Sequence, residues 1–226
     1  NRDGSEGTMG GNAIRGVAKY LYDYNITAMQ DCGSGKNAPT AIITIETKSG
    51  IKDLTLYKLE GKVSSVCVNM GLPSFAPESL PTSLAVTEND KIVNAPLAVD
   101  GMSYNVTCVS MGNPHCVVFS SFVDKVDLEK LGPMFENNEA FPERTNTEFV
   151  RVVGPNELKM RVWERGNGET FACGTGACAA VVASVLNGYC KKDEDISVAV
   201  RGGKLTVRYT DEGIFLTGNA TELFQG

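Results

Sequence analysis

The sequence predicts an α/β protein that is rich in strands and built from two similar domains that face each other. Three observations lead to this fold class. Short runs of β-branched and aromatic residues, bounded by Gly, Pro, Asn or Asp, dominate the chain, and helical patterns are few. One loop pattern occurs twice. A Pro-rich stretch, LPSFAPESLP over 72–81, separates the two copies and is the best candidate for an interdomain linker.

The repeated loop reads DGSEGTMGGNAIRG over 3–16 and ERGNGETFACGTGACAA over 164–180. When the two copies are aligned, Cys173 falls on Gly10, and each copy continues into a helix-like run of small residues. We therefore predict that the two loops face each other across a cleft, each at the N-terminus of a helix. One loop carries a thiol and the other does not.

The remaining elements follow in chain order. A helix is expected over 12–24, directly after the first loop, and others over 128–135 and 174–187, where Gly188 ends the pattern. The helix over 174–187 is rich in Ala and Val on every side, which predicts a helix buried all round inside a curved sheet. Strands are expected at 41–46, 54–59, 63–69, 104–110, 116–120, 147–153, 157–163, 196–201, 205–209 and 213–217.

Composition excludes several classes of protein. With 226 residues, 42% of them hydrophobic, the chain can bury a sizeable core. A net charge of −6 without any run of Lys or Arg argues against a nucleic-acid partner. The longest apolar stretch, around 177–186, is too short to span a bilayer, so we expect no membrane partner and a cytoplasmic location.

Because the chain opens without Met, inside turn-forming residues, we also expect a fragment whose start is missing.

The cysteines are expected to be reduced. Seven is an odd number, and no CxxC pair occurs, which argues against a disulfide framework and against a zinc site. Cys173 differs from the others because it stands directly before Gly-Thr-Gly at an expected helix start. Backbone N–H groups and the helix dipole there favour a thiolate and a bound carboxylate. The alternative is a small core residue, as we expect for Cys67, Cys108, Cys116, Cys178 and Cys190.

Other candidates are polar residues in loops. A Gly-Asn-Pro turn would place Asn113 and His115, the single histidine, at a strand edge, where an imidazole can transfer protons; a turn histidine of no consequence is the alternative. Glu164 and Arg165 end an expected strand and could hold a substrate's ammonium and carboxylate, or form a solvated salt bridge. Two amides in loops, which are usually turn residues, are Asn1 and Asn146.

Together these motifs resemble the diaminopimelate epimerase family, cofactor-independent enzymes that invert one stereocentre of 2,6-diaminoheptanedioate on the path to lysine and peptidoglycan. The resemblance covers the whole chain and rests on NRDGSE (1–6), MGGNAIR (9–15), VNMG (68–71), GNPHC (112–116), PERTN (142–146) and ERGNGETFACGTG (164–176). It implies two pseudo-symmetric domains, each a curved sheet wrapped around a central helix, with the active site between them. The implied domains are 1–69 and 70–218, with 219–226 returning to the first.

The resemblance also implies a mechanism. One thiol removes the α-proton from one face of the carbon and a second thiol delivers a proton to the other face, which converts the LL to the meso isomer. The implied catalytic positions are Cys173, His115, Glu164 and Gly10, where the family has its other cysteine. The implied substrate-binding residues are Asn1, Gly11, Asn12, Asn113, Asn146, Glu164, Arg165, Gly174 and Thr175. The family uses no cofactor and no metal, and the implied assembly is a homodimer.

The resemblance implies that this chain departs from the family at two cysteine positions, Gly10 and Gly16. It also leads us to expect that the family's opening segment and last few residues are missing from this sequence. With one of two thiols missing, we expect impaired inversion. Three functions stay open. The first is an epimerase or related amino-acid racemase, the second a thiol acyl-transferase with Cys173 as nucleophile and His115 as base, and the third a catalytically silent protein that binds an amino acid.

Overall fold

The computed structural model describes residues 10–27, 30–32, 40–87 and 89–221. Every helix and strand expected from the sequence is present. Two short strands and β5 were not predicted; β5 contains Pro96, which weakens a strand pattern but is tolerated at the edge of the sheet, where β5 lies. The elements are α1 (Gly11–Asp23), β1 (Gln30–Asp31), β2 (Ala41–Thr47), β3 (Gly50–Leu59), β4 (Lys62–Asn69), β5 (Ala95–Val99), β6 (Met102–Ser110), β7 (Pro114–Phe119), the 3-10 helix η1 (Val123–Lys125), α2 (Leu128–Glu136), β8 (Asn146–Gly154), β9 (Glu157–Glu164), β10 (Gly168–Glu169), α3 (Gly174–Leu186), β11 (Asp195–Val200), β12 (Gly203–Tyr209) and β13 (Ile214–Asn219).

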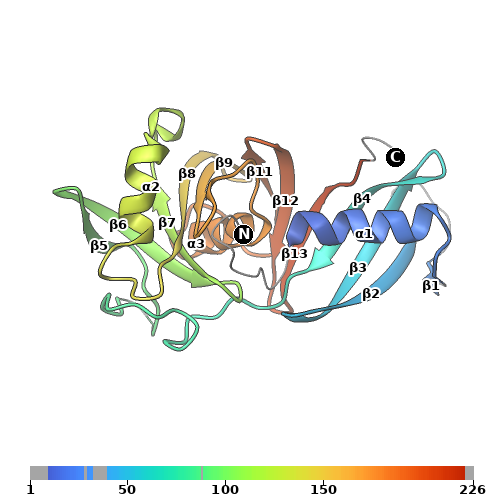
Figure 1. Ribbon diagram of the computed structural model, residues 1–226, viewed down its shortest axis with the longest axis horizontal. Coiled ribbons are helices and arrows are strands. Elements are labelled where there is room, and N and C mark those ends of the chain that lie inside the picture. Colours follow the sequence, from blue (N-terminus) through green and yellow to red (C-terminus); the bar gives the residue numbers. More distant parts are fainter. Residues whose placement is uncertain (1–9, 28–29, 33–39, 88, 222–226) are drawn as a thin grey trace.

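Within the described residues, one long sheet runs through two lobes of the molecule (Figure 1). Its strand order is β1-β2-β3-β4-β13-β12-β11-β9-β8-β7-β6-β5, with β10 paired to β9. Neighbours are antiparallel except β7 with β8 and β9 with β11. The last strand, β13, joins the lobes, since it pairs with β12 on one side and with β4 on the other. The domain boundaries given above stay a prediction.

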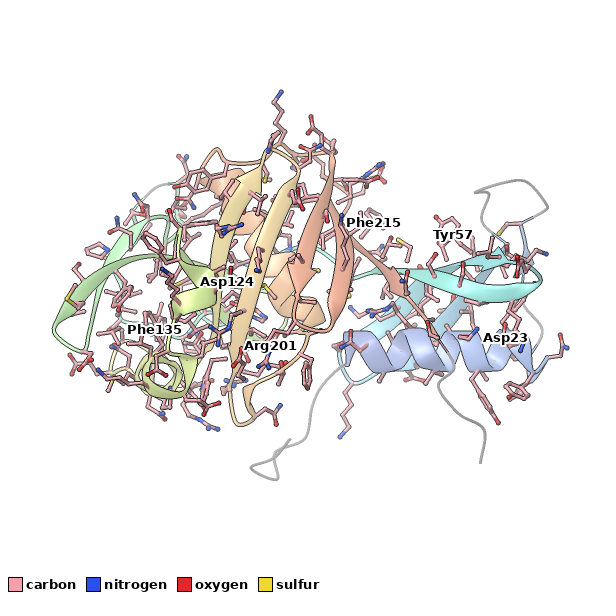
Figure 2. The ribbon with its side chains drawn as sticks, turned by 90° about the horizontal axis from the view of Figure 1, so that it is seen from above. Asp23, Tyr57, Asp124, Phe135, Arg201 and Phe215 are labelled. Carbon is pink, nitrogen blue, oxygen red and sulfur yellow. The ribbon has the colours of Figure 1, made fainter. Side chains whose placement is uncertain are left out.

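Helix α3 is enclosed by the larger lobe, as its composition predicted. It packs against β6, β7, β8, β9, β12 and β13, and the residues from Ala177 to Ser184 are all fully buried. Small side chains at every position allow this, because a helix of Ala and Val can be approached closely from all sides. Figure 2 shows the strands of this lobe arranged around the helix.

Helix α1 has the same length as α3 but packs with one face only. Both helices follow an extended N-cap residue and end at a residue with positive φ, Asn25 in α1 and Gly188 in α3. In both helices, the N–H groups of the two residues after the C-cap donate hydrogen bonds to carbonyl groups of the last helical turn. This pattern is a Schellman motif. However, α1 covers β3 and β4 with a single buried stripe, whereas Tyr20 and Tyr24 on the opposite side are exposed. The expected wrapping is therefore seen for α3, and for one side of α1.

A second core lies between α2 and the strands β5 to β9. Phe135 packs edge-on against Phe149 and Tyr104, with ring centroids 5.4 and 5.1 Å apart. Trp163, the single tryptophan, lies against Gly132 of α2, and its indole Nε1 donates to Glu136 at 2.7 Å. This core matters for the site because Trp163 directly precedes Glu164.

Candidate active site

The two repeated loops meet where the lobes join. A Cβ atom built on Gly11 would lie 3.5 Å from the Cα atom of Gly174, so the first residues of α1 and α3 are in contact. The Asn12 side chain crosses the junction, with its Nδ2 donating to the carbonyl of Ala172 at 3.4 Å. The prediction that the two loops face each other, each at a helix N-terminus, is therefore confirmed, whereas the cleft expected between them stays a prediction.

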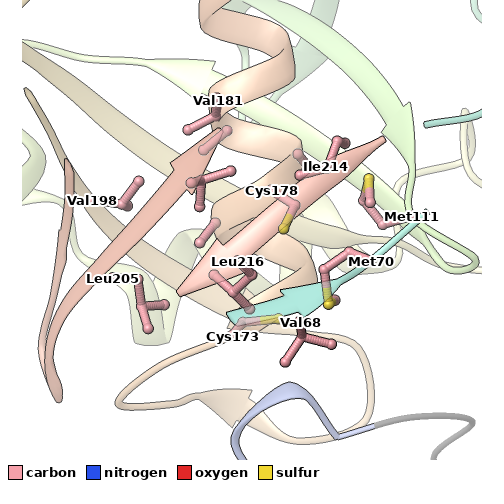
Figure 3. Packing of buried hydrophobic residues seen from close by; sticks show 14 of the residues in the cluster. Val68, Met70, Met111, Cys173, Cys178, Val181, Val198, Leu205, Ile214 and Leu216 are labelled. Carbon is pink, nitrogen blue, oxygen red and sulfur yellow. The ribbon is translucent and has the colours of Figure 1, made fainter. Parts of the chain in front are cut away.

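Cys173 and Gly10 hold equivalent positions in this arrangement. Each is the N-cap residue of its helix, with φ and ψ of −121° and 116° for Cys173 and −108° and 102° for Gly10. The Cys173 sulfur accepts a hydrogen bond from Gly176 N–H at 3.3 Å and lies 3.4 Å from Thr175 Oγ1. Figure 3 shows Cys173 at the end of the core cluster, beside Leu216.

The Cys173 thiol is held in its neutral form. Burial raises its pKa well above the ordinary value, and the nearby carboxylates of Glu164 and Glu148 raise it further. The hydrogen bonds from Thr175 and Gly176 act in the opposite direction but are outweighed. The prediction of a stabilised thiolate is therefore wrong for this state of the protein, because the sequence shows the helix start but not how completely the sulfur is shielded from water.

His115 is fully buried and lies close to the Cys173 loop. Its Nδ1 is 2.7 Å from Glu148 Oε1, and its Nε2 is 3.0 Å from Asn113 Oδ1. Asn113 Nδ2 in turn donates to Thr175 Oγ1 at 3.4 Å. Glu148 was not singled out from the sequence, although a carboxylate inside the apolar strand NTEFVRVV was a signal that could have identified it.

Asn146 braces the backbone around the site. Its Nδ2 donates to the carbonyl of Pro114 at 2.8 Å, and its Oδ1 accepts from Arg165 N–H at 2.9 Å. The side chain is buried, and both of its polar groups are used by the protein itself. The Arg165 guanidinium donates to the carbonyl of Glu143. Asn146 thus holds the backbone of Arg165 in position. The direct contact between Asn146 and substrate that the sequence resemblance implied stays a prediction.

The segment from Glu164 to Cys173 is anchored at several points. The Glu164 carboxylate accepts a hydrogen bond from Thr170 Oγ1, and Gly166 N–H donates to the buried Glu136 at 2.9 Å. Glu169 binds Arg161 through two hydrogen bonds of 2.9 and 3.1 Å. Its other ion pair, with Arg201, spans 3.0 Å. These contacts hold the segment that leads to Cys173 in place.

Most of the predicted site residues come together in this structure. Asn1 lies outside the described residues. Around the junction of α1 and α3 the described part of the chain gathers Gly10, Gly11, Asn12, Asn113, His115, Glu164, Cys173, Gly174 and Thr175. Asn146 and Arg165 are bonded to each other, and Asn146 is linked to the others through Pro114. No cluster of three or more metal-binding side chains occurs in the described ranges. Nor does any helix described there have the length and apolarity needed to cross a membrane.

Comparison with known proteins decides the family. A sequence model described as diaminopimelate epimerase matches residues 107–223. The diaminopimelate epimerase of Agathobacter rectalis is 48% identical over 232 residues, which cover 100% of this chain and 77% of that protein. The corresponding enzyme of Desulfovibrio desulfuricans is 44% identical, with 100% and 76% covered. The chain belongs to the diaminopimelate epimerase family.

Solved structures agree with this assignment at the level of fold. A probable proline racemase from Agrobacterium radiobacter has a TM-score of 0.62 at 13% identity, covering 94% of this chain and 65% of that one. A hydroxyproline epimerase from Agrobacterium vitis has a TM-score of 0.61 at 14% identity, covering 90% and 61%. This chain therefore spans somewhat less than two thirds of these two structures. The expected α/β fold class is therefore confirmed, with α3 enclosed by the sheet and α1 packed on it by one face.

Proposed function

We propose that this chain inverts, or partly catalyses the inversion of, the α-carbon of diaminopimelate without a cofactor. The observation that carries the proposal is the contact between two helix N-termini, of which one is capped by the thiol of Cys173. An amino-acid carboxylate placed there would meet backbone N–H groups from the first turns of both helices. These groups would stabilise the negative charge that develops when the α-proton leaves.

Proton transfer would involve Cys173 on one face of the α-carbon. The neutral thiol is suited to deliver a proton, and it becomes a base only after losing its own proton to a neighbour such as the Glu164 carboxylate. On the other face Gly10 offers no donor. We therefore infer that the chain exchanges the α-proton on one face and completes inversion poorly.

Proton exchange into deuterated water tests this proposal. LL- and meso-diaminopimelate are incubated separately with the protein, and deuterium at the α-carbons and net epimerisation are followed by mass spectrometry and chiral chromatography. We expect one stereoisomer to exchange far faster than the other, with negligible net inversion, and Cys173→Ser to abolish the exchange. Equal exchange of both isomers would mean that another group supplies the second proton.

Two other functions are tested by the same measurements. Binding of diaminopimelate without any exchange would identify a silent amino-acid-binding protein. Faster exchange with proline or hydroxyproline would identify a racemase of another amino acid. Acyl transfer is disfavoured, because both ring nitrogens of His115 are engaged by Glu148 and Asn113, whereas a Cys–His nucleophile needs the imidazole against the sulfur.

The assembly and location remain proposals as well. We infer a homodimer from the family resemblance, and a cytoplasmic location from the sequence, whose longest apolar stretch is too short to span a bilayer. Sedimentation velocity at several protein concentrations measures the assembly, and a mass equal to one chain at all of them would contradict it.

A further inference from the structure

Glu148 is a buried carboxylate with a single specific partner. Its Oε1 lies 2.7 Å from His115 Nδ1, and the side chains of both residues have 0% exposure. Its Oε2 has no hydrogen-bond partner among the residues that the structure describes. A buried carboxylate without full compensation costs the fold several kcal/mol by general estimates, so its presence calls for a function other than stability.

The hydrogen bonds around His115 determine which ring nitrogen carries a proton. Asn113 Oδ1 is an acceptor, so Nε2 must be the donor in the 3.0 Å bond between them. The opposite nitrogen, Nδ1, faces Glu148, and one proton lies between the two atoms. The ring is therefore held in one orientation by partners on both sides, with a donor at Nε2 and a shared proton at Nδ1.

The same network continues to the thiol. Because Asn113 uses Oδ1 to accept from His115, its Nδ2 group is turned towards Thr175 Oγ1, 3.4 Å away. Thr175 accepts that bond, which leaves its hydroxyl proton free to be donated to the Cys173 sulfur at 3.4 Å. An unbroken series of contacts thus leads from Glu148 through His115 and Asn113 to the proposed reacting atom.

The position of Glu148 under helix α3 supports the same conclusion. A Cβ atom on Gly176 would lie 2.6 Å from Glu148 Oε1, so this carboxylate occupies space that only a glycine leaves open. The first turn of α3 carries the partial positive charge of the helix dipole, which favours a carboxylate on its inner side. Gly176 of the Gly-Thr-Gly motif therefore contributes to the placement of both residues: its N–H bonds the Cys173 sulfur, and its missing side chain leaves space for the Glu148 carboxylate.

We propose that Glu148 is a positioning residue, which fixes the His115 ring so that Nε2–H holds Asn113 with its amide group directed at Thr175 and the Cys173 loop. This rests on the proposed function for its effect on catalysis, but not for its effect on His115. Glu148 acts through His115 and Asn113 and does not itself contact the reacting atoms.

Nitrogen-15 NMR of histidine-labelled protein tests the structural part directly, because His115 is the single histidine and its signals need no assignment. In the unchanged protein we expect Nε2 to carry a proton and a strongly deshielded, slowly exchanging proton to mark the bond at Nδ1. Glu148→Gln should remove that signal and shift both ring nitrogens. The control is Thr147→Val, at the neighbouring buried residue on the opposite face of β8. Its Oγ1 has no hydrogen-bond partner in the part of the chain that the structure describes, so this change should leave the His115 spectrum unchanged.

A double-mutant cycle tests the catalytic part. We expect Glu148→Gln to lower kcat/KM for α-proton exchange by about ten- to a hundredfold, as is typical when the group that orients a functional side chain is lost. Combined with Asn113→Ala, the loss should be no larger than that of Asn113→Ala alone, because both changes interrupt one series of contacts. The proposal would be overturned if the kcat/KM losses of the two single variants multiplied in the double variant. A His115 spectrum that Glu148→Gln leaves unaltered would overturn it as well.

Two further measurements keep the test decisive. If Glu148→Gln does not fold, Glu148→Asp retains the charge but is one methylene too short to reach Nδ1, and the same spectral change is expected. If the unchanged protein exchanges no α-proton at all, the proposed function fails, whereas the NMR comparison still decides whether Glu148 orients His115.

Discussion

Gly11 and Gly174 are in contact at the junction of the two lobes, where a Cβ atom on the former would stand 3.5 Å from the Cα atom of the latter. Each is the first residue of its helix, so the contact brings the first turns of two helices, with their outward-directed N–H groups, to one place. A site that recognises a carboxylate there depends on both halves of the chain. The residues just before the two glycines, Gly10 and Cys173, then decide what chemistry the site can perform.

Replacing Gly10 by Cys should increase net inversion of diaminopimelate by about a hundredfold or more, because a second thiol would supply the proton that the other face lacks. Space is available among the described residues, where the Cβ atom of residue 10 would meet Ala13 Cβ at an ordinary 3.4 Å. Chiral chromatography of the product measures the gain. Gly16→Cys is the matched control, because it adds a thiol to an open position of the same helix that is not an N-cap. An equal effect of both variants would contradict the role of residue 10.

Cys173 should react slowly with iodoacetamide in the absence of ligand. Its raised pKa means that the thiolate is scarce at neutral pH, and the fraction should still be increasing with pH above 9.0, the ordinary value for a thiol. Exposed Cys32 provides the internal comparison and should react faster than the buried Cys173 at pH 7. Peptide mass spectrometry gives both rates. Thr175→Val removes a hydrogen bond that favours the thiolate and should slow Cys173 further; rapid labelling of Cys173 at pH 7 would contradict the assigned direction.

Local patterns in the sequence were sufficient to predict the α-helices and most of the strands. They also predicted that Gly10 and Cys173 hold equivalent positions in the two loops. The all-apolar helix over 174–187 was correctly expected to be enclosed, because no face of it could be left in water. The bond between His115 and Glu148 could not be predicted, since it joins parallel neighbours β7 and β8, whose register depends on tertiary packing. Burial of the Cys173 sulfur also depends on tertiary packing and was not predicted. The direction in which the Cys173 pKa is shifted was therefore predicted wrongly.

Glu169 should make stability depend on pH in the acidic range. Burial opposes its ionisation, but the hydrogen bonds and charges of Arg161 and Arg201 outweigh burial and hold its pKa below the ordinary value of 4.5. A lowered carboxyl pKa gives stabilisation that is complete above the unfolded-state pKa and is lost as the pH falls through the folded-state value. Glu169→Gln should therefore be less stable at pH 7, and the difference from the unchanged protein should shrink below pH 4.5.

Urea unfolding at a series of pH values measures this effect. Asp124→Asn is the control, because Asp124 forms an exposed ion pair with Lys159, and such surface pairs contribute little to the free energy of unfolding. A stability difference for Glu169→Gln that stays constant from pH 7 to pH 4 would show that packing, rather than ionisation, accounts for the loss.

Gly132→Ala should destabilise the protein by about 3 kcal/mol, because the added methyl group would overlap the indole ring of Trp163. The ring is enclosed and hydrogen-bonded to Glu136, so it can retreat only by displacing the end of β9. That end is Glu164, and we therefore expect slower α-proton exchange together with altered tryptophan fluorescence. Gly16→Ala is the same chemical change in a helix position with open space around it, and it should stabilise by about 0.5–1 kcal/mol. Equal unfolding midpoints for the two variants in urea would mean that α2 can move away from Trp163 at no cost, and that this packing does not position the Glu164 carboxylate.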